Sequence, residues 1–539
     1  MRIFGSILIV SFTAAHVVAQ APEARPGQQL DLQTLGRTVR AKQSSTQLTA
    51  AAKAAVEKLL ADSASLQAAG RTGEARRLLA NALTLLGDRK WDQKEEFVWS
   101  LALRPDKVVA DSLLPLTIRL TQAYPAAYET KTGLTLRVSL EEAKSSNPAK
   151  DLGSFSVSSR DLIDQPFAME MNLDGVADGS YRLAADLLEG DTTLVRMSED
   201  LQLVQSIESQ RSAVERRLAK IQGHDSAKAT VRWPYDMARV VNLGIRKWNS
   251  GDFGLREDRT QTFDFVKEIR DSQQTLKVLE SGSDPLLRAK GDHERHYWFK
   301  EAGEIMPYRL YVPTKWDGRS KLRMIFVLHG NSRDHDFYFD RDNGILPKLA
   351  EQYSFLVVCP MGYRPSAGYN ATALRSLSGV QADAAPRNPG RGGFGGFDPA
   401  RQRQSEWSET DAMNVLDLVQ REYPIDPARI YLFGHSAGGT GGWYLAAKYP
   451  EKFAGIALSA FNTRPETYPF DKVKGKPVMV IIGTKDTPNT LATVRLMAKI
   501  LDEKGLSPYF LEVEGATHDN IVGIAEPKVF EFFDKHSRK

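Results

Sequence analysis

Short apolar runs dominate the second half of the chain, and small or polar residues follow each run. The runs are residues 323–328, 355–360, 429–433, 478–483 and 508–513. They are rich in β-branched and aromatic residues, which is typical of strands buried on both faces of a parallel sheet. Two further runs, 296–299 and 308–312, are expected to be the first strands of the same sheet. The pattern predicts an α/β domain.

The first half of the chain shows other periodicities. Residues 48–86 are rich in Ala and Leu at helical spacing, and a Gly-containing break at 70–73 predicts a helical hairpin. From about 97 to 204 apolar and polar residues alternate, which predicts a small β-sandwich of immunoglobulin-like architecture. From about 206 to 282 the helical pattern returns. The sandwich is either a sugar-binding module or a structural spacer.

These patterns divide the chain into five segments. They are a signal peptide (1–19), a helical hairpin (20–95), the β-sandwich module (96–205), a helical linker region (206–290) and the α/β domain (291–539). The length of 539 residues agrees with more than one domain. The predicted fold class is therefore α/β, with helices and a β module preceding the α/β domain.

The first residues have the features of an export signal. A short basic start, Met1-Arg2, precedes the mostly apolar stretch 3–18, and Val17-Val18-Ala19 provides a small-x-Ala cleavage site. We expect a secreted or periplasmic protein, with a retained anchor as the alternative. The stretch is too short for a convincing membrane span.

Composition narrows the possible functions. A net charge of +4 on 539 residues provides no signal for nucleic-acid or membrane binding. The single cysteine, Cys359, lies in an apolar run and cannot form an internal disulfide. No Cys/His spacing typical of a metal site occurs, and Asp340–Gly344 matches only part of a calcium loop. We expect neither metal nor cofactor, and the sequence leaves the oligomeric state open.

The segment Gly434-His435-Ser436-Ala437-Gly438 follows an apolar run and precedes a helical pattern. A Gly-x-Ser-x-Gly between strand and helix is the nucleophile elbow of an α/β hydrolase, in which a strained turn exposes the serine hydroxyl. The alternative is an ordinary Gly-rich turn. We predict that Ser436 is a nucleophile and that side chains at 434 and 438 would collide with the adjoining strand and helix.

An acid and a histidine follow in the order that this fold requires. The segment Thr484-Lys485-Asp486 comes directly after the run 478–483, and His518 follows the last expected strand. Both therefore lie at the same edge of the sheet as the elbow. We predict that His518 is the general base and Asp486 its orienting acid. The rivals fit poorly, because Asp502 falls inside an expected helix and Asp519 adjoins the histidine.

An oxyanion hole is expected from two backbone N–H groups. One belongs to Ala437, after the nucleophile, and the other to Asn331, after the run 323–328. Gly330 permits close approach of the backbone, and His329 is expected to support this loop. We expect His435, inside the elbow, to pack beside the nucleophile.

These motifs carry a family resemblance over roughly residues 295–539. They are Leu328–Asn331, Ile425–Tyr431, Gly434–Gly439, Gly483–Asp486 and His518. The chain resembles esterase-D-like α/β hydrolases, most of all carbohydrate esterase family 1, which includes feruloyl and acetylxylan esterases, and the polyhydroxybutyrate depolymerase-like esterases. It also resembles the catalytic domain of prolyl-oligopeptidase-type peptidases.

The resemblance implies a serine hydrolase that cleaves carboxylic esters through an acyl-enzyme without a cofactor. The leading substrates are acyl or feruloyl esters, including those on plant polysaccharide. A prolyl-oligopeptidase-type peptidase is the main alternative, although the first half lacks the blade repeats of a propeller. A non-catalytic binding protein on a hydrolase scaffold is the alternative from another class.

A long Gly-, Arg- and Pro-rich stretch lies between Pro360 and a helix expected to begin near Ser408. A loop of this length is either functional or solvated and irregular. As a lid, it would use Arg391, Arg401 or Arg403 to meet an anionic group. Ser408 or Asp411 is expected to cap the following helix, and Asp411 is a weaker functional candidate.

Overall fold

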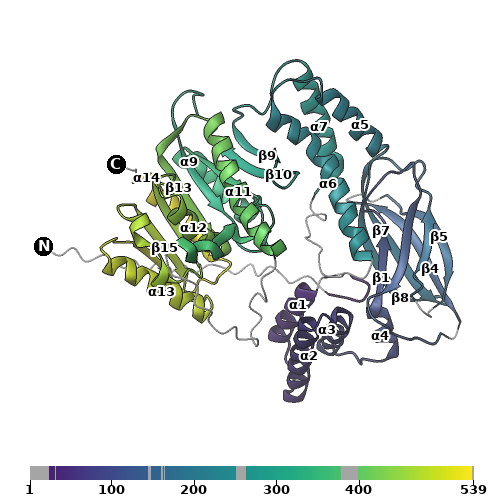
Figure 1. Ribbon diagram of the computed structural model, residues 1–539. Coiled ribbons are helices and arrows are strands. Elements are labelled where there is room, and N and C mark those ends of the chain that lie inside the picture. Colours follow the sequence, from purple (N-terminus) through teal and green to yellow (C-terminus); the bar gives the residue numbers. More distant parts are fainter. Residues whose placement is uncertain are drawn as a thin grey trace. The chain divides into compact units, whose positions relative to one another are not determined.

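The computed structural model describes most of the chain and divides it into two compact units (Figure 1). The described residues are 24–28, 30, 32–130, 132–143, 147–158, 162, 164–249, 263–377 and 399–536. One unit comprises 222–230 and the described residues from 278 onward, and the other comprises 231–277 and those up to 221. The predicted signal peptide lies outside the described residues, and the predicted boundaries of the five segments stay predictions.

In the described part of the second half, eight strands form one mostly parallel sheet in the order β16-β15-β14-β13-β11-β12-β10-β9. The strands are β9 (Gly291–Phe299), β10 (Glu304–Val312), β11 (Leu322–Leu328), β12 (Phe355–Pro360), β13 (Ile425–His435), β14 (Gly455–Ser459), β15 (Val478–Gly483) and β16 (Tyr509–Val513). Strand β10 pairs antiparallel with β9 and β12, and the other pairs are parallel. The predicted α/β fold and its strands are confirmed.

Helices cover both faces of this sheet (Figure 1). Alternate residues of β11 separate the two cores: Met324 and Phe326 belong to one apolar cluster, and Ile325 and Val327 to the other. The first cluster includes helices α11 (Pro399–Glu422), α12 (Ala437–Lys448) and α13 (Pro488–Glu503). The second includes α9 (Ile345–Tyr353) and α14 (Ile521–Asp534). Burial on both faces explains the unbroken apolar runs.

The segment before β13 differs from its prediction. Helix α11 begins at Pro399, not near Ser408, so that Ser408 and Asp411 lie inside the helix and do not cap it. Proline is well suited to the first helical turn, and the Arg and Gln residues that follow are good helix formers. Short helices also occupy 368–373 (η2) and 374–377 (α10). Arg401 and Arg403 belong to α11, whereas Arg391 lies outside the described residues.

The other unit starts with the predicted hairpin. The hairpin consists of α2 (Ala50–Ala68) and α3 (Thr72–Leu86), and the helices α1 (Leu32–Ser45) and α4 (Gln93–Ser100) flank it. Gly70 has φ +74°, a conformation that glycine adopts without strain, and it ends α2. The Ser63 hydroxyl donates to the Ala75 carbonyl at 3.1 Å across the hairpin. The predicted helix-turn-helix is confirmed.

Two antiparallel sheets follow and share one apolar core. One consists of β1 (Leu101–Pro105), β3 (Leu116–Gln122) and β6 (Phe167–Met171). The other consists of β2 (Val109–Ala110), β8 (Thr192–Leu203), β7 (Gly179–Glu189), β4 (Leu134–Glu142) and β5 (Lys150–Val157), with β2 alone in parallel pairing. The predicted sandwich architecture is present.

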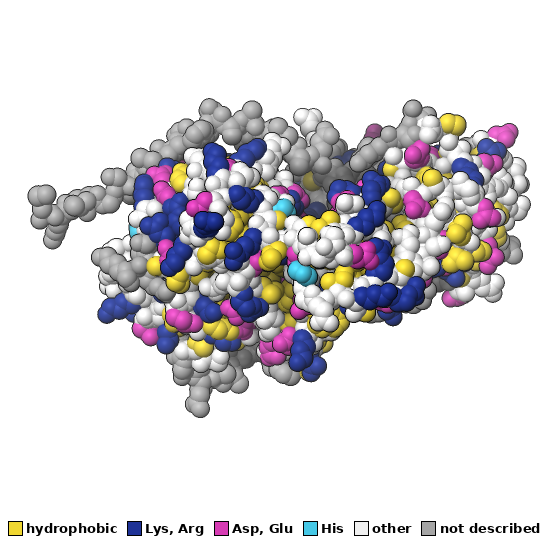
Figure 2. All heavy atoms as spheres, turned by 90° about the horizontal axis from the view of Figure 1, so that it is seen from above, with side chains coloured by type: hydrophobic (Ala, Val, Ile, Leu, Met, Phe, Trp, Pro, Cys, Tyr) yellow, Lys and Arg dark blue, Asp and Glu magenta, His cyan; other side chains and the backbone are white. Residues whose placement is uncertain are grey.

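Helices α5 (Ile207–Leu218), α6 (Asp225–Asn249) and α7 (Phe265–Glu280) follow the sandwich, as the helical pattern predicts. The Ser272 hydroxyl donates to the Val231 carbonyl at 2.9 Å and joins α7 to α6. Among the described residues, none of the helices combines the length and the apolar character that spanning a membrane requires. Basic and acidic side chains both occur across the face shown in Figure 2.

Candidate active site

Ser436 lies at the turn between β13 and α12, where the sequence predicts the elbow. Its backbone has φ 56° and ψ −117°, values that a residue with a side chain rarely adopts. The Ser436 N–H donates to the Ser459 carbonyl at the end of β14, at 2.9 Å. The neighbouring strand therefore helps to hold the strained turn that projects the hydroxyl from the sheet.

Two glycines make this turn possible, for the steric reason predicted. A Cβ atom at Gly434 would overlap the Gly438 carbonyl in the first turn of α12. A Cβ atom at Gly438 would overlap the Leu328 carbonyl of β11 and lie 2.6 Å from the His329 carbonyl oxygen. Helix α12 can start directly above the sheet because neither position carries a side chain.

The structure brings Ser436, His518 and Asp486 together. His518 Nε2 lies 3.0 Å from Ser436 Oγ, and His518 Nδ1 lies 2.8 Å from Asp486 Oδ2. The Asp486 side chain is fully buried, whereas 35% of the His518 side chain is exposed. A buried carboxylate bonded to Nδ1 leaves Nε2 to accept the serine proton. The rival acid Asp502 lies in α13, as expected.

The loops that carry the acid and the histidine are bonded to each other. The Lys485 N–H donates to the Ala516 carbonyl at 2.9 Å, and the Gly515 N–H donates to Thr484 Oγ1 at 2.8 Å. A Cβ atom at Gly483 would overlap the Ala516 carbonyl. The sequence shows Gly483 as the end of a strand, but its role in permitting this close approach depends on the pairing of β15 with β16.

The loop after β11 lies against the nucleophile. A Cβ atom at Gly330 would be 3.4 Å from Ser436 Cβ, so the peptide that joins Gly330 to Asn331 lies beside the serine. Ala437 is the first residue of α12, where a backbone N–H has no partner within the helix. Of the two residues predicted to form an oxyanion hole, Ala437 directly follows Ser436, and Asn331 directly follows the glycine that approaches it.

Two further histidines support the site. The buried His329 ring bridges two carbonyls, with Nε2 2.8 Å from Met361 O and Nδ1 2.9 Å from Gly330 O. The His435 ring lies 4.8 Å from the His518 ring, and its Nδ1 is 3.2 Å from Ser459 Oγ. Burial lowers the pKa of His435 well below its usual range, and the neighbouring His518 acts in the same direction. His435 is therefore a neutral packing partner at neutral pH.

Asp411 stabilises the loop after β12, a role that the sequence does not reveal. Its carboxylate accepts hydrogen bonds from the Tyr297 hydroxyl at 2.5 Å and the Tyr363 N–H at 2.8 Å. Burial raises the pKa of Asp411 to about 6, although these hydrogen bonds oppose the rise. Asp411 anchors backbone near the site and takes no part in the Ser–His–Asp arrangement.

Glu409 supports the same region from the same helix. Its buried carboxylate accepts hydrogen bonds from Asn370, Tyr444 and Tyr449 and forms an ion pair with Lys448. Burial alone would raise the pKa of Glu409, but these partners outweigh it and lower the pKa. The sequence signal for both acids is weak, because their partners come from β9, the loop after β12, η2 and the C-terminal end of α12.

Comparisons with known proteins find similarity within the second half of the chain. Residues 299–490 match the family described as "Putative esterase". A stretch of 55 residues is 38% identical to an S-formylglutathione hydrolase of Rattus norvegicus; it makes up 10% of this chain and 20% of the rat enzyme. The match to this curated relative thus spans only a fifth of its length.

Several solved structures are similar to a little under half of the chain. An S-formylglutathione hydrolase from Staphylococcus aureus is 15% identical with a TM-score of 0.33, over 46% of this chain and 99% of its own. A CE1 ferulic acid esterase from Anaeromyces mucronatus is 16% identical with a TM-score of 0.34, over 47% of this chain and 93% of its own. The esterase-family match at residues 299–490 lies within the α/β domain and includes Ser436 and Asp486.

Proposed function

We propose that this protein hydrolyses carboxylic esters through an acyl-enzyme formed on Ser436. The observation that carries the proposal is the continuous hydrogen-bonded series from Ser436 Oγ through His518 to the buried Asp486 carboxylate. A serine on a strained elbow with a histidine at 3.0 Å has the geometry of an activated nucleophile. The match to an esterase family supports ester hydrolysis in particular.

Each group has a defined part in the proposed reaction. Ser436 Oγ attacks the ester carbonyl while His518 Nε2 takes its proton, and Asp486 stabilises the resulting imidazolium. The N–H groups of Ala437 and Asn331 stabilise the oxyanion. Collapse of the tetrahedral intermediate expels the alcohol, which receives the proton from His518. Water then attacks the acyl-enzyme by the same route and releases the carboxylic acid.

The substrate class is proposed from the family resemblance. Motifs shared with carbohydrate esterase family 1 favour acyl or feruloyl esters, including those attached to plant polysaccharide. The local identity to an S-formylglutathione hydrolase favours a thioester as a second class. The apolar stretch after Met1-Arg2 supports the proposal that the enzyme is secreted or periplasmic.

The test is a substrate panel with the purified protein. It contains p-nitrophenyl acetate and butyrate, methyl ferulate, acetylated xylan, S-formylglutathione and a prolyl-peptide anilide. We expect ester turnover that Ser436→Ala abolishes and that Ser156→Ala, an exposed serine on β5, leaves unchanged. A fluorophosphonate probe should label Ser436 in the parent protein, as mapped by peptide mass spectrometry.

Three outcomes would change the proposal. Preferential cleavage of the anilide would identify a peptidase instead. Turnover that persists in Ser436→Ala would show that the reaction uses another group. Absence of both turnover and fluorophosphonate labelling in a folded protein would favour a binding protein on a hydrolase scaffold.

A further inference from the structure

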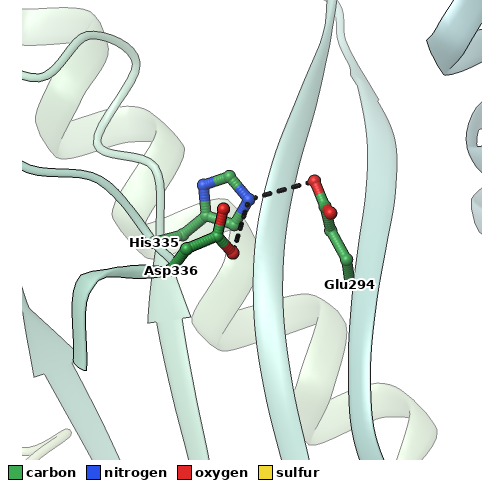
Figure 3. A group of neighbouring side chains, drawn as sticks. All are labelled: Glu294, His335 and Asp336. Atoms are coloured by element: carbon green, nitrogen blue, oxygen red, sulfur yellow. Dashed lines mark hydrogen bonds and ion pairs between the residues drawn. The ribbon is translucent and has the colours of Figure 1, made fainter. Parts of the chain in front are cut away.

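Glu294, His335 and Asp336 form a compact group outside the Ser–His–Asp arrangement (Figure 3). Glu294 lies on β9, whereas His335 and Asp336 lie in the loop between β11 and α8 (Phe337–Asp340). One potential ligand atom from each residue lies within 4.8 Å of the other two. In Figure 3 the imidazole points toward the Glu294 carboxylate from the opposite element. Tertiary structure alone assembles this group, because 41 positions separate Glu294 from His335.

A second buried imidazole faces the same carboxylate. His335 Nε2 lies 3.2 Å from Glu294 Oε1, and His296 Nε2 lies 3.5 Å from the same oxygen. The side chain of His335 is fully buried, and that of His296 is 3% exposed. His296 Nδ1 lies 3.3 Å from Thr230 Oγ1, so the side of the ring away from Glu294 meets a hydroxyl. A polar partner on the other ring nitrogen is typical of a metal-binding histidine.

The spacing of these atoms suits a small divalent ion. His335 Nε2, which lies 3.2 Å from Glu294 Oε1, also lies 3.5 Å from Asp336 Oδ1. Zinc ligands at about 2.0–2.1 Å in tetrahedral geometry lie about 3.3–3.4 Å from one another. Two of the three separations among Glu294, His335 and Asp336 therefore match those of ligands on one ion, and the third is at most 4.8 Å. His296 lies next to the group, with its Nε2 3.5 Å from Glu294 Oε1.

The local charge also favours a cation. In the described ion pairs, Arg309 contacts three carboxylates, those of Asp292, Asp336 and Asp340. Glu294, which contacts His335 and His296, adds a fourth carboxylate to this region.

We propose that Glu294, His335 and Asp336, with His296 beside them, bind one divalent transition-metal ion, for which Zn²⁺ is the probe. Imidazole nitrogen with carboxylate oxygen selects such ions over calcium, which takes six to eight oxygen ligands. The ion would join β9 to the loop that begins at His329 and carries Asn331, one of the two predicted oxyanion donors. It is a structural ion in this proposal and takes no part in ester cleavage.

The experiment uses tag-free, chelator-treated full-length protein. Titration with Zn²⁺ followed by calorimetry should give one site per chain, and thermal unfolding should shift upward until that site is saturated. Co²⁺ should bind at the same site and give the intense visible absorption of a four-coordinate ion. Glu294→Gln, Asp336→Asn and His335→Asn should each lower the affinity by at least about tenfold.

Matched controls separate coordination from general charge effects. His293→Asn removes a histidine one position before Glu294, and Asp340→Asn removes a carboxylate that contacts Arg309; both should retain the site. Circular dichroism establishes that each variant is folded, and the partly exposed Glu294 and Asp336 provide tests if His335→Asn does not fold. Failure of the parent protein to bind Zn²⁺, or equal binding by all variants, would overturn the proposal. These experiments measure metal binding and not ester turnover, so their result does not depend on the result of the esterase panel.

Discussion

The strands of the α/β sheet and those of the sandwich bury their side chains in different ways. Every residue of β12 and β15 is buried, because helices cover both faces of the sheet. In β4, buried and more exposed residues alternate over most of the strand. A strand buried on both faces has no position along its length for a polar catalytic group.

This difference explains where the chemistry lies. In the α/β sheet the polar candidates come just after a strand: Asn331 after β11, Ser436 after β13 and Asp486 after β15. The carboxyl ends of these parallel strands meet at one edge, so groups distant in sequence converge there. In the sandwich, polar side chains are spread along exposed faces, as Arg137 is on β4. The sandwich pattern therefore builds a stable module without concentrating reactive groups.

The largest difference between the regions should come from exchanging an aspartate for asparagine in each. Asp486→Asn should lower kcat for p-nitrophenyl acetate by about 10⁴-fold, because the amide holds the imidazole in the wrong tautomer. Asp186→Asn removes an exposed acid of β7 that pairs with Arg196, and it should leave kcat unchanged. If Asp486→Asn kept kcat within about tenfold of the parent value, the role assigned to Asp486 would be contradicted.

A buried glutamate should produce the next largest effect, on stability. Both carboxyl oxygens of Glu526, on α14, are buried without a hydrogen-bond partner among the described residues, and burial raises its pKa to about 8. The folded protein holds this proton more tightly than the unfolded chain. Its contribution to stability is therefore greatest below pH 4.5 and is lost as the pH rises toward 8.

Glu526→Gln should remove this loss. Since each pKa unit corresponds to about 1.4 kcal/mol, the variant should gain at most about 4–5 kcal/mol in the free energy of unfolding at pH 9. Urea denaturation at pH 4 and pH 9 measures the change. The control Glu141→Gln, from an exposed ion pair on β4, should change stability by less than about 1 kcal/mol at either pH. Equal pH dependence in the parent protein and Glu526→Gln would show that Glu526 is not the group responsible.

Alanine substitutions at adjacent strand positions should sharpen the contrast in burial. Ile481 and Ile482 of β15 are fully buried in different clusters, so each change to alanine should destabilise by about 2–5 kcal/mol. In β4, Leu136→Ala should cause a similar loss, whereas Arg137→Ala should stay within about 0.5 kcal/mol. Urea denaturation of the four variants tests the pattern, and alternation in β15 would contradict burial on both faces.

The smallest expected effect on stability concerns two glycines. Gly438→Ala forces a methyl group against the Leu328 carbonyl and should destabilise by about 1–3 kcal/mol, with loss of esterase activity. Gly175 has φ +76° but has no neighbouring atoms within 4 Å of an added Cβ, so Gly175→Ala should cost about 1 kcal/mol and keep activity. Thermal unfolding and ester turnover separate the two variants, and full activity in Gly438→Ala would contradict the steric argument.

Much of the candidate site was predictable, because its parts follow local rules. The elbow around Ser436 requires glycines at fixed spacing, and Asp486 directly follows an apolar strand. The start of α11 was not predictable, because the Gly- and Pro-rich composition obscured a helix that begins at Pro399. The role of Asp411 was likewise hidden, since its partners Tyr297 and Tyr363 come from elements far away in sequence.

The sequence by itself determined the α/β class, the order of the strands along the chain and the residues that end them. Periodicity and turn chemistry are local properties, so they can be read without knowledge of neighbours. Only the tertiary structure decided that Gly483 approaches Ala516, that Glu526 is buried, and that Glu294 meets His335. Those contacts depend on which strands are adjacent and on how closely the backbones pack. Both are determined by the burial of the whole core and not by any local segment.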